Sequence, residues 1–267
     1  MLIVDSHCHT GSNWEEPIET LLYQMNANGV SHIVLIQYEG YYDNSYLIDC
    51  TKRYGNRFKA VIMLNPADKS RTKTLERLHK EGASGFRVLI REEWDANEPV
   101  YEVAGKLGMV VSVMGNSEHF ADAKFKKLLD RCPDTKFCLE HLCRAAKAGT
   151  DYAKPPHDGF KAALECGKWP NTTVKVPGLG EIIPRPRPFL PGNDCPWTNI
   201  PPLYEMAMEA FGVQRMMWGS NFPPCARLEG YRHALEWVRD YPAFQKSDDV
   251  EWIMGKSAAK FWGFPSQ

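Results

Sequence analysis

The sequence predicts a single-domain (β/α)8 barrel, a TIM barrel, over residues 1–267. Eight short apolar segments of strand length recur along the chain, and stretches with the apolar spacing of amphipathic helices separate most of them. This alternation implies a parallel sheet, and eight units in a chain of this length fit a closed barrel better than an open sheet. No Gly-x-Gly-x-x-Gly follows the first segment, which disfavours a dinucleotide-binding sheet.

The predicted strands are continuous apolar runs, the pattern of strands covered on both faces. They span residues 2–5, 32–37, 58–64, 85–90, 109–113, 136–140, 172–176 and 215–219. Helical spacing is clearest over 17–28, 70–81, 122–131 and 203–211, and Gly29, Gly82 and Gly108 end helical stretches as C-cap glycines do. A last helix over 251–261 is expected to close the outer ring.

Two late connections, 142–157 and 177–202, are long, and the second holds eight prolines. Because the loops that follow barrel strands lie over the mouth of the active site, we expect 177–202 to form a stiffened lid or pocket wall. The alternative is a proline-rich surface loop that makes no contact with substrate.

Composition excludes several classes of partner. The chain has 32 basic and 33 acidic residues and a formal charge of −1, so nucleic acid is not an expected partner. Neither a signal-peptide pattern nor an apolar run near the ~20 residues of a membrane span is visible, so we expect a cytoplasmic protein without a membrane partner. The eight cysteines include no Cys-x-x-Cys pair and are expected to be buried thiols. Assembly into a homo-oligomer stays open.

The most specific local pattern is Asp5-Ser-His-Cys-His9 at the end of the first predicted strand. Alternation along a strand places Asp5, His7 and His9 on one face and Ser6 and Cys8 on the other. Two imidazoles so spaced can share one ion with metal–nitrogen bonds of roughly 2.0–2.1 Å. Two hydrogen-bonded surface histidines are the alternative interpretation.

His141 ends the sixth predicted strand and is therefore expected at the same rim of the barrel as His7 and His9. Three convergent histidines suit a divalent ion, zinc first, and leave one coordination position for water. The sequence thus predicts a metal site of His7, His9 and His141, with a metal-free site as the alternative.

The ordered set of motifs resembles the amidohydrolase-related family, which includes 2-pyrone-4,6-dicarboxylate lactonase, sugar lactonases and aromatic decarboxylases. The resemblance spans the chain, from Asp5–His9 through Glu140-His141 and Met217-Trp-Gly-Ser-Asn-Phe-Pro223 to Ile253-Met-Gly-Lys-Ser-Ala258. It implies a barrel hydrolase that opens a small carboxylate-bearing lactone, with metal optional in some members.

The sequence departs from the family at Asn221, where members carry an aspartate thought to take the proton from the attacking water. An amide is not a general base at neutral pH, although its carbonyl can ligate a metal or hold a water. Asn221 and His141 are therefore the candidate catalytic residues, with the base supplied by Glu140, Glu181 or a histidine. Asn221 also leaves two other possibilities open. The chain is a natural barrel that binds a ligand without turnover, or it is an enzyme inactivated by an engineered Asp→Asn substitution.

Four cationic or titratable side chains are candidate ligands of the substrate. Arg87 can grip a carboxylate with its bidentate fork, and Lys175 lies in an otherwise apolar strand, where a buried cation is costly unless paired. His157 and Arg185 lie on the two long loops. For Arg87 and Lys175 a buried salt bridge is the competing interpretation, and for the loop residues plain exposure.

The leading hypothesis is hydrolysis of a cyclic ester, in which a divalent ion, if bound, polarises the carbonyl and acidifies a water. Without metal, the histidines would stabilise the oxyanion by hydrogen bonding. The first rival is metal-dependent decarboxylation of an aromatic acid, and the second is a noncatalytic binding barrel.

Overall fold

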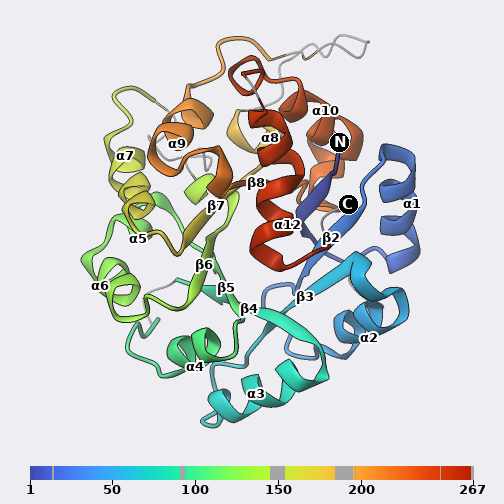
Figure 1. Ribbon diagram of the computed structural model, residues 1–267, viewed down its shortest axis with the longest axis vertical. Coiled ribbons are helices and arrows are strands. Elements are labelled where there is room, and N and C mark those ends of the chain that lie inside the picture. The colour runs from blue at the N-terminus through green and yellow to red at the C-terminus, as the bar shows by residue number, and fades with distance from the viewer. Residues whose placement is uncertain are drawn as a thin grey trace.

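The computed structural model describes residues 1–13, 15–90, 94–144, 154–183, 195, 197–246 and 248–265. One parallel sheet runs in the order β1 to β8. Its strands are β1 (Val4–Cys8), β2 (His32–Ile36), β3 (Phe58–Met63), β4 (Ala83–Leu89), β5 (Val110–Met114), β6 (Lys136–Leu139), β7 (Thr172–Val176) and β8 (Met216–Trp218). The predicted (β/α)8 barrel is therefore confirmed (Figure 1).

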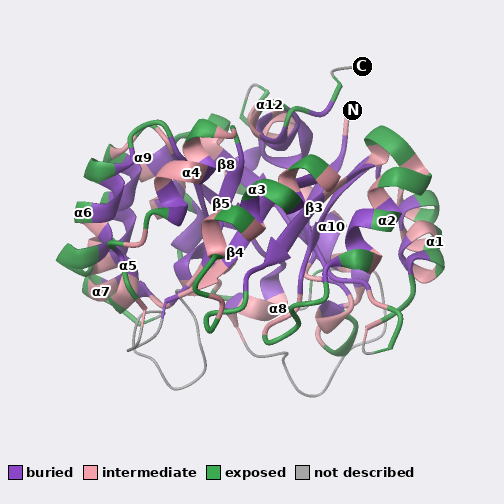
Figure 2. Cartoon of the chain, turned by 90° about the horizontal axis from the view of Figure 1, so that it is seen from below, coloured by how far each residue is buried: buried purple, intermediate pink, exposed green. Residues whose placement is uncertain are grey.

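Most of the helices surround the sheet and turn their exposed faces outward (Figure 2). The helices are α1 (Ile18–Asn28), α2 (Ser45–Tyr54), α3 (Arg71–Glu81), α4 (Val100–Lys106), α5 (Ser117–Ala121), α6 (Ala123–Arg131), α7 (Asp158–Leu164), α8 (Leu179–Ile182), α9 (Leu203–Phe211), α10 (Tyr231–Arg239), α11 (Asp249–Glu251) and α12 (Ser257–Trp262). Apolar side chains of the helices pack on outward-facing strand residues in one large core. Gly29 ends α1 in the left-handed conformation (φ 67°), as a C-cap glycine does.

The barrel closes where β1 meets the segment that follows β8. The backbone N–H of His9 donates to the carbonyl of Phe222 (2.7 Å), and that of Asn221 donates to the carbonyl of His7 (2.8 Å). Gly219 allows this approach, because a Cβ there would lie 2.7 Å from the Cβ of His7. The closure brings the first motif of the chain against the Trp-Gly-Ser-Asn turn.

The last helix lies at a different place from the one predicted. Instead of joining the outer ring, α12 crosses the amino-terminal end of the barrel (Figure 1), where Trp262 and Phe264 pack with interior strand residues such as Val4 and Val34. The ring of Phe264 also contacts His32 at the start of β2. The small, apolar face of this helix explains its position, because the open end of the barrel needs an apolar cover.

All eight cysteines are free thiols, and only Cys195 is exposed, in agreement with the sequence prediction of buried thiols. Among the residues that the structure describes, no helix has both the length and the apolar composition that crossing a membrane requires.

Candidate active site

At the carboxyl-terminal end of the strands, the barrel interior is lined by charged and polar side chains. Among the buried ones are His7, Arg87, Ser112, Glu140 and Lys175. They come from β1, β4, β5, the residue after β6, and β7. The structure thus brings together candidates that lie up to 168 residues apart in the chain.

A bulge in β1 decides which of its side chains enter this site. The register against β2 shifts between Asp5 and Cys8, and the Cys8 thiol donates to the Asp5 carboxylate at 2.9 Å. Asp5 therefore shares the outer side with Cys8, and the prediction that it faces the same way as His7 and His9 was wrong. The inserted residue breaks strict alternation.

Asp5 ties the seam of the barrel together. Its carboxylate accepts the backbone N–H groups of Ser220 (2.9 Å) and His7 (3.1 Å) and the hydroxyl of Tyr231 (2.9 Å). Burial raises the pKa of Asp5, although the hydrogen bonds from Cys8, Ser220 and His7 oppose that shift. We assign Asp5 to positioning of His7 and of the turn that carries Asn221.

The three predicted imidazoles converge. Ring centroids lie 5.0 Å apart for His7 and His9 and 4.6 Å apart for His7 and His141. His141 begins a turn in which residues 141–144 all have positive φ, a conformation that costs roughly 1–2 kcal/mol per residue. The surrounding packing must hold such a turn in place, and it aims His141 at the barrel axis.

Hydrogen bonds at Nδ1 fix the imidazoles of His9 and His141. His9 Nδ1–H donates to the carbonyl of Ile36 (2.8 Å), and His141 Nδ1–H donates to Glu181 Oε2 (2.8 Å). Both rings then carry a lone pair on Nε2. Burial lowers the pKa of His9 to about 3, so this ring is neutral at physiological pH.

His7 has a different partner, the amine of Lys175, whose Nζ lies 2.9 Å from His7 Nδ1 and 3.3 Å from the hydroxyl of Ser112. When Lys175 is an ammonium ion it donates to Nδ1, and His7 carries its proton on Nε2. Burial and the positive charge of Lys175 lower the pKa of His7 well below its usual range. Burial likewise lowers the pKa of Lys175.

Glu140 is the most heavily bonded carboxylate of the site. Arg87 donates to it through Nη2 (2.7 Å) and Nε (3.1 Å), and Ser112 donates its hydroxyl at 2.7 Å. Burial alone would raise the pKa of Glu140, but the charges of Arg87 and Lys175 outweigh that and lower it. Glu140 is therefore a permanently ionised partner of Arg87 and a poor proton acceptor.

Asn221 lies at φ 56°, in the left-handed region that asparagine and aspartate tolerate better than most residues. Its Nδ2 donates to Glu181 Oε1 at 2.8 Å, while the other oxygen of Glu181 accepts from His141. Burial would raise the pKa of Glu181, but the charge that His141 carries when protonated and the hydrogen bonds from His141 and Asn221 lower it. Asn221, Glu181 and His141 thus form one chain of hydrogen bonds.

The donor set fits a divalent ion. Nε2 of His7 is buried without a hydrogen-bond partner, and His9 and His141 offer Nε2 lone pairs. One group of potential ligand atoms, all within 4.8 Å of one another, belongs to His7, Glu140 and His141. His9 is not part of this group, and Glu140 is engaged by Arg87, so a ligand role for the three histidines stays a prediction.

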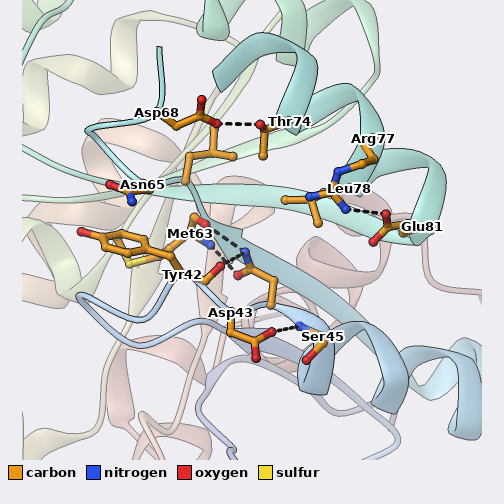
Figure 3. Close-up of a pocket in the computed structure, with 12 residues that line it drawn as sticks. Tyr42, Asp43, Ser45, Met63, Asn65, Asp68, Thr74, Arg77, Leu78 and Glu81 are labelled. Carbon is orange, nitrogen blue, oxygen red and sulfur yellow. Dashed lines mark hydrogen bonds and ion pairs between the residues drawn. The ribbon is translucent and has the colours of Figure 1, made fainter. Parts of the chain in front are cut away.

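Two cavities lie at the same end of the barrel, over β2–β4. The smaller, of about 210 Å³, is lined by polar side chains that pair with one another, as Asp68 does with Thr74 and Arg77 with Glu81 (Figure 3). The larger, of about 830 Å³, includes Arg87 in its wall.

The remaining predicted site residues are placed less directly. His157 is buried at the N-terminal boundary of α7, and Arg185, with residues 184–194 of the proline-rich loop, lies outside the described residues. Sequence reasoning missed Ser112, which bonds both Glu140 and Lys175. The available signal was a single polar residue, the serine, within the apolar strand Val110-Val-Ser-Val113. Lys175 was noticed for the same reason, as one polar residue in an apolar strand.

A parallel barrel with histidines and paired charges at the carboxyl ends of its strands defines the class of the protein, a TIM-barrel protein with an enzyme-like site. The chain belongs to the amidohydrolase family, whose model matches residues 15–264. This membership supports an enzyme. An uncharacterized protein of Sinorhizobium fredii, y4mH, is 34% identical over 104 residues, which are 38% of this chain and 29% of the length of that relative.

Solved structures share the fold over nearly the whole chain. A putative 2-pyrone-4,6-dicarboxylic acid hydrolase from Pseudomonas putida has a TM-score of 0.78 and 21% identity, and the match covers 100% of this chain and 99% of the other. An amidohydrolase from Burkholderia multivorans with bound zinc gives 0.79 and 18%, covering 99% and 100%. The 5-carboxyvanillate decarboxylase of Sphingomonas paucimobilis gives 0.65 and 12%, covering 99% of each. At these identities the likeness shows the fold alone.

Proposed function

We propose that the protein is a lactonase-like hydrolase that opens a small carboxylate-bearing cyclic ester by attack of water. One observation carries the proposal, the hydrogen-bonded chain from Asn221 through Glu181 to His141, with 2.8 Å at each link. It supplies a base at the place where the family aspartate is missing.

His141 is the base in this proposal. Glu181 accepts the Nδ1 proton of His141, which fixes the tautomer with a free Nε2 and stabilises the imidazolium that forms when Nε2 takes a proton from water. Glu140 is excluded from that role by its bonds to Arg87 and Ser112. Asn221 acts on Glu181, which it holds in the orientation that His141 requires.

The carbonyl oxygen of the lactone gains negative charge as water adds. Nε2 of His7 is a buried group without a partner, and in the tautomer that a Lys175 ammonium imposes it donates a hydrogen bond toward the site. After ring opening, the proton held on His141 passes to the leaving alkoxide oxygen. Atoms balance, because water contributes a hydroxyl to the acid and a proton to the alcohol.

Arg87 and Lys175 supply positive charge beneath the substrate and favour a carboxylate-bearing one. Their donors already bond Glu140, His7 and Ser112, so we assign them electrostatic attraction and positioning. We also propose that His157 and Arg185 contact the substrate directly. Residues 177–202 would form a lid over it. The name of the Pseudomonas putida relative supports a dicarboxylate substrate.

In the alternative with a divalent ion, zinc first, the ion would be held by His7, His9 and His141, and His141 would then be a ligand instead of the base. When bound the ion would polarise the lactone carbonyl and lower the pKa of a water from 15.7 toward about 7. The zinc in the Burkholderia multivorans barrel supports this choice of ion.

The test measures metal content of the purified protein and hydrolysis of a panel of carboxylate-bearing lactones, after chelation and after addition of zinc. We expect lactone hydrolysis in at least one state. Inactivity on every lactone in both states, or carbon dioxide release from a hydroxybenzoate without lactone opening, would overturn the proposal in favour of a binding barrel or a decarboxylase.

The Asn221→Asp variant tests whether His141 is the base or whether the enzyme lost its base when asparagine replaced the family aspartate. An aspartate would place a second carboxylate against Glu181, so the pair would repel or share a proton and the bond to His141 would weaken. We expect kcat to fall roughly tenfold or more. A large rise would show that Asn221 replaces the true base. The matched control is Asn97→Asp, in the exposed loop before α4.

A further inference from the structure

The larger cavity at the carboxyl-terminal end of the strands has no role in the reaction proposed above. Its volume, about 830 Å³, lies within the ~300–1,000 Å³ of small-molecule sites. Its walls come from the loop after β2, the ends of β3 and β4, and the start of α4. The lining side chains that matter here are Leu64, Phe86, Leu89, Trp94 and Tyr101.

Of the polar groups in these walls, which also include the carboxylates of Glu39 and Asp95, four are paired with one another. Trp94 Nε1–H donates to the hydroxyl of Tyr101 (2.6 Å), and Arg71 pairs with Glu98 at 2.9 Å. Since these groups satisfy one another, much of the surface left to a ligand is hydrocarbon and aromatic ring. Such a wall favours an apolar occupant over a charged one.

Arg87 connects the cavity with the reaction site. It forms part of the cavity wall, while its guanidinium group bonds Glu140, the neighbour of His141. Gln37, whose carbonyl accepts from Arg87, precedes Tyr38, whose ring centroid lies 5.6 Å from that of His9. Arg87 is thus shared by the cavity wall and the reaction site, and a substrate that occupied both would pass beside its side chain.

We propose that this cavity is a substrate subsite that binds an apolar arm, an alkyl or aryl group attached to the ring that is opened. The proposal rests on the proposed function for the reacting part of the molecule. The arm itself is recognised by Leu64, Leu89 and Trp94, which makes the cavity the determinant of chain-length preference.

The kinetic test uses δ-lactones that differ only in the substituent next to the ring oxygen: hydrogen, propyl or heptyl. Because each buried methylene contributes several-fold to binding, kcat/KM should rise at least tenfold from hydrogen to heptyl. Leu89→Trp and, independently, Leu64→Phe fill the cavity and should flatten that series. Tyr23→Trp, on the exposed face of α1, is the matched control and should leave it unchanged.

A binding test is independent of turnover, so its failure is distinguishable from failure of the lactonase proposal. Calorimetry compares octanoate, acetate and citrate on the wild type and on the two filled variants. We expect octanoate to bind at least tenfold more tightly than acetate and to lose that advantage in the filled variants. Equal binding of octanoate and acetate, tighter binding of citrate, or an advantage that survives filling would overturn the subsite.

Discussion

The two ends of the barrel interior are made from the same strands but from opposite kinds of side chain. The amino-terminal layer is apolar and includes Val61, Val110, Cys138 and Met217, sealed by Trp262 of α12. The carboxyl-terminal layer holds the histidines and the buried charged side chains. Figure 2 shows α12 and α8 on opposite sides of the barrel.

The transition takes a single step along each strand. In β5, Val110 belongs to the apolar layer and Ser112 to the charged one, and Cys138 and Glu140 are related in the same way. Two residues of a strand span about 6.6 Å. Residues that stabilise the fold and residues that line the site therefore occupy different positions along the same strand. A substitution should affect mainly stability or mainly activity.

The largest expected effect is on activity, in the charged layer. His141→Asn removes the base while keeping a polar side chain, and it should lower kcat by about 10²–10⁴-fold with the free energy of unfolding changed by less than about 1 kcal/mol. Steady-state kinetics on an active lactone and urea unfolding measure the two quantities. Glu181→Gln should lower kcat as well.

His79→Asn, on α3 and far from the imidazoles, is the control for this substitution. If His141→Asn keeps more than a tenth of wild-type kcat, His141 is not the base.

The next largest effect is expected at the buried ion pair of Arg87 and Glu140, because this part of the charged layer also contributes to stability. Arg87→Met leaves Glu140 buried without its partner and should destabilise the fold by about 3–5 kcal/mol. Adding Glu140→Gln removes the unpaired charge and should recover part of that loss. A cost below about 1 kcal/mol for Arg87→Met would show that water or Lys175 already compensates Glu140.

The apolar layer should respond in the opposite sense. Met217→Ala creates a cavity among fully buried side chains and should lower the free energy of unfolding by about 3 kcal/mol. The pH profile and KM of the folded enzyme should stay as in the wild type. A shift in either would mean that the two layers are not independent.

The sequence predicted the fold because every strand carries its own signal. Continuous apolar runs mark all eight, and the predicted strand over 172–176 and the helix over 203–211 match β7 and α9 at both ends. The last helix was misplaced because amphipathic spacing reports an apolar face and not the surface that this face covers.

The candidate site was predictable in its members but not in their partners. His7, His9 and His141 followed from motif position, since ends of parallel strands meet at one rim. The bulge that turns Asp5 outward and the left-handed turn at His141 leave no residue pattern, because both depend on contacts with residues far away in the chain. Pairing of Arg87 with Glu140 depends on register across several strands, which no local window contains.

Glu229 provides the smallest test, at the border of the charged layer. Its carboxyl is buried behind α8, and a Cβ at Gly178 or Gly180 would collide with it. Burial and the nearby charge of Glu181 raise its pKa to about 8. Among the described residues, Cys195, Tyr204 and Cys225 also interact with it, and burial raises the pKa of each.

In the unfolded chain Glu229 releases its proton near pH 4.5, whereas in the fold it does so near pH 8. Folding is therefore favoured by the bound proton below pH 4.5, and this stability is lost as pH rises through the window up to about 8. Between pH 5.5 and 7 the unfolding free energy of the wild type should fall by about 2 kcal/mol relative to Glu229→Gln, which cannot ionise. Urea unfolding of both proteins at the two pH values measures this difference. Parallel changes in the two would mean that Glu229 is ionised in the fold, and that the border of the charged layer tolerates a carboxylate that the apolar layer could not.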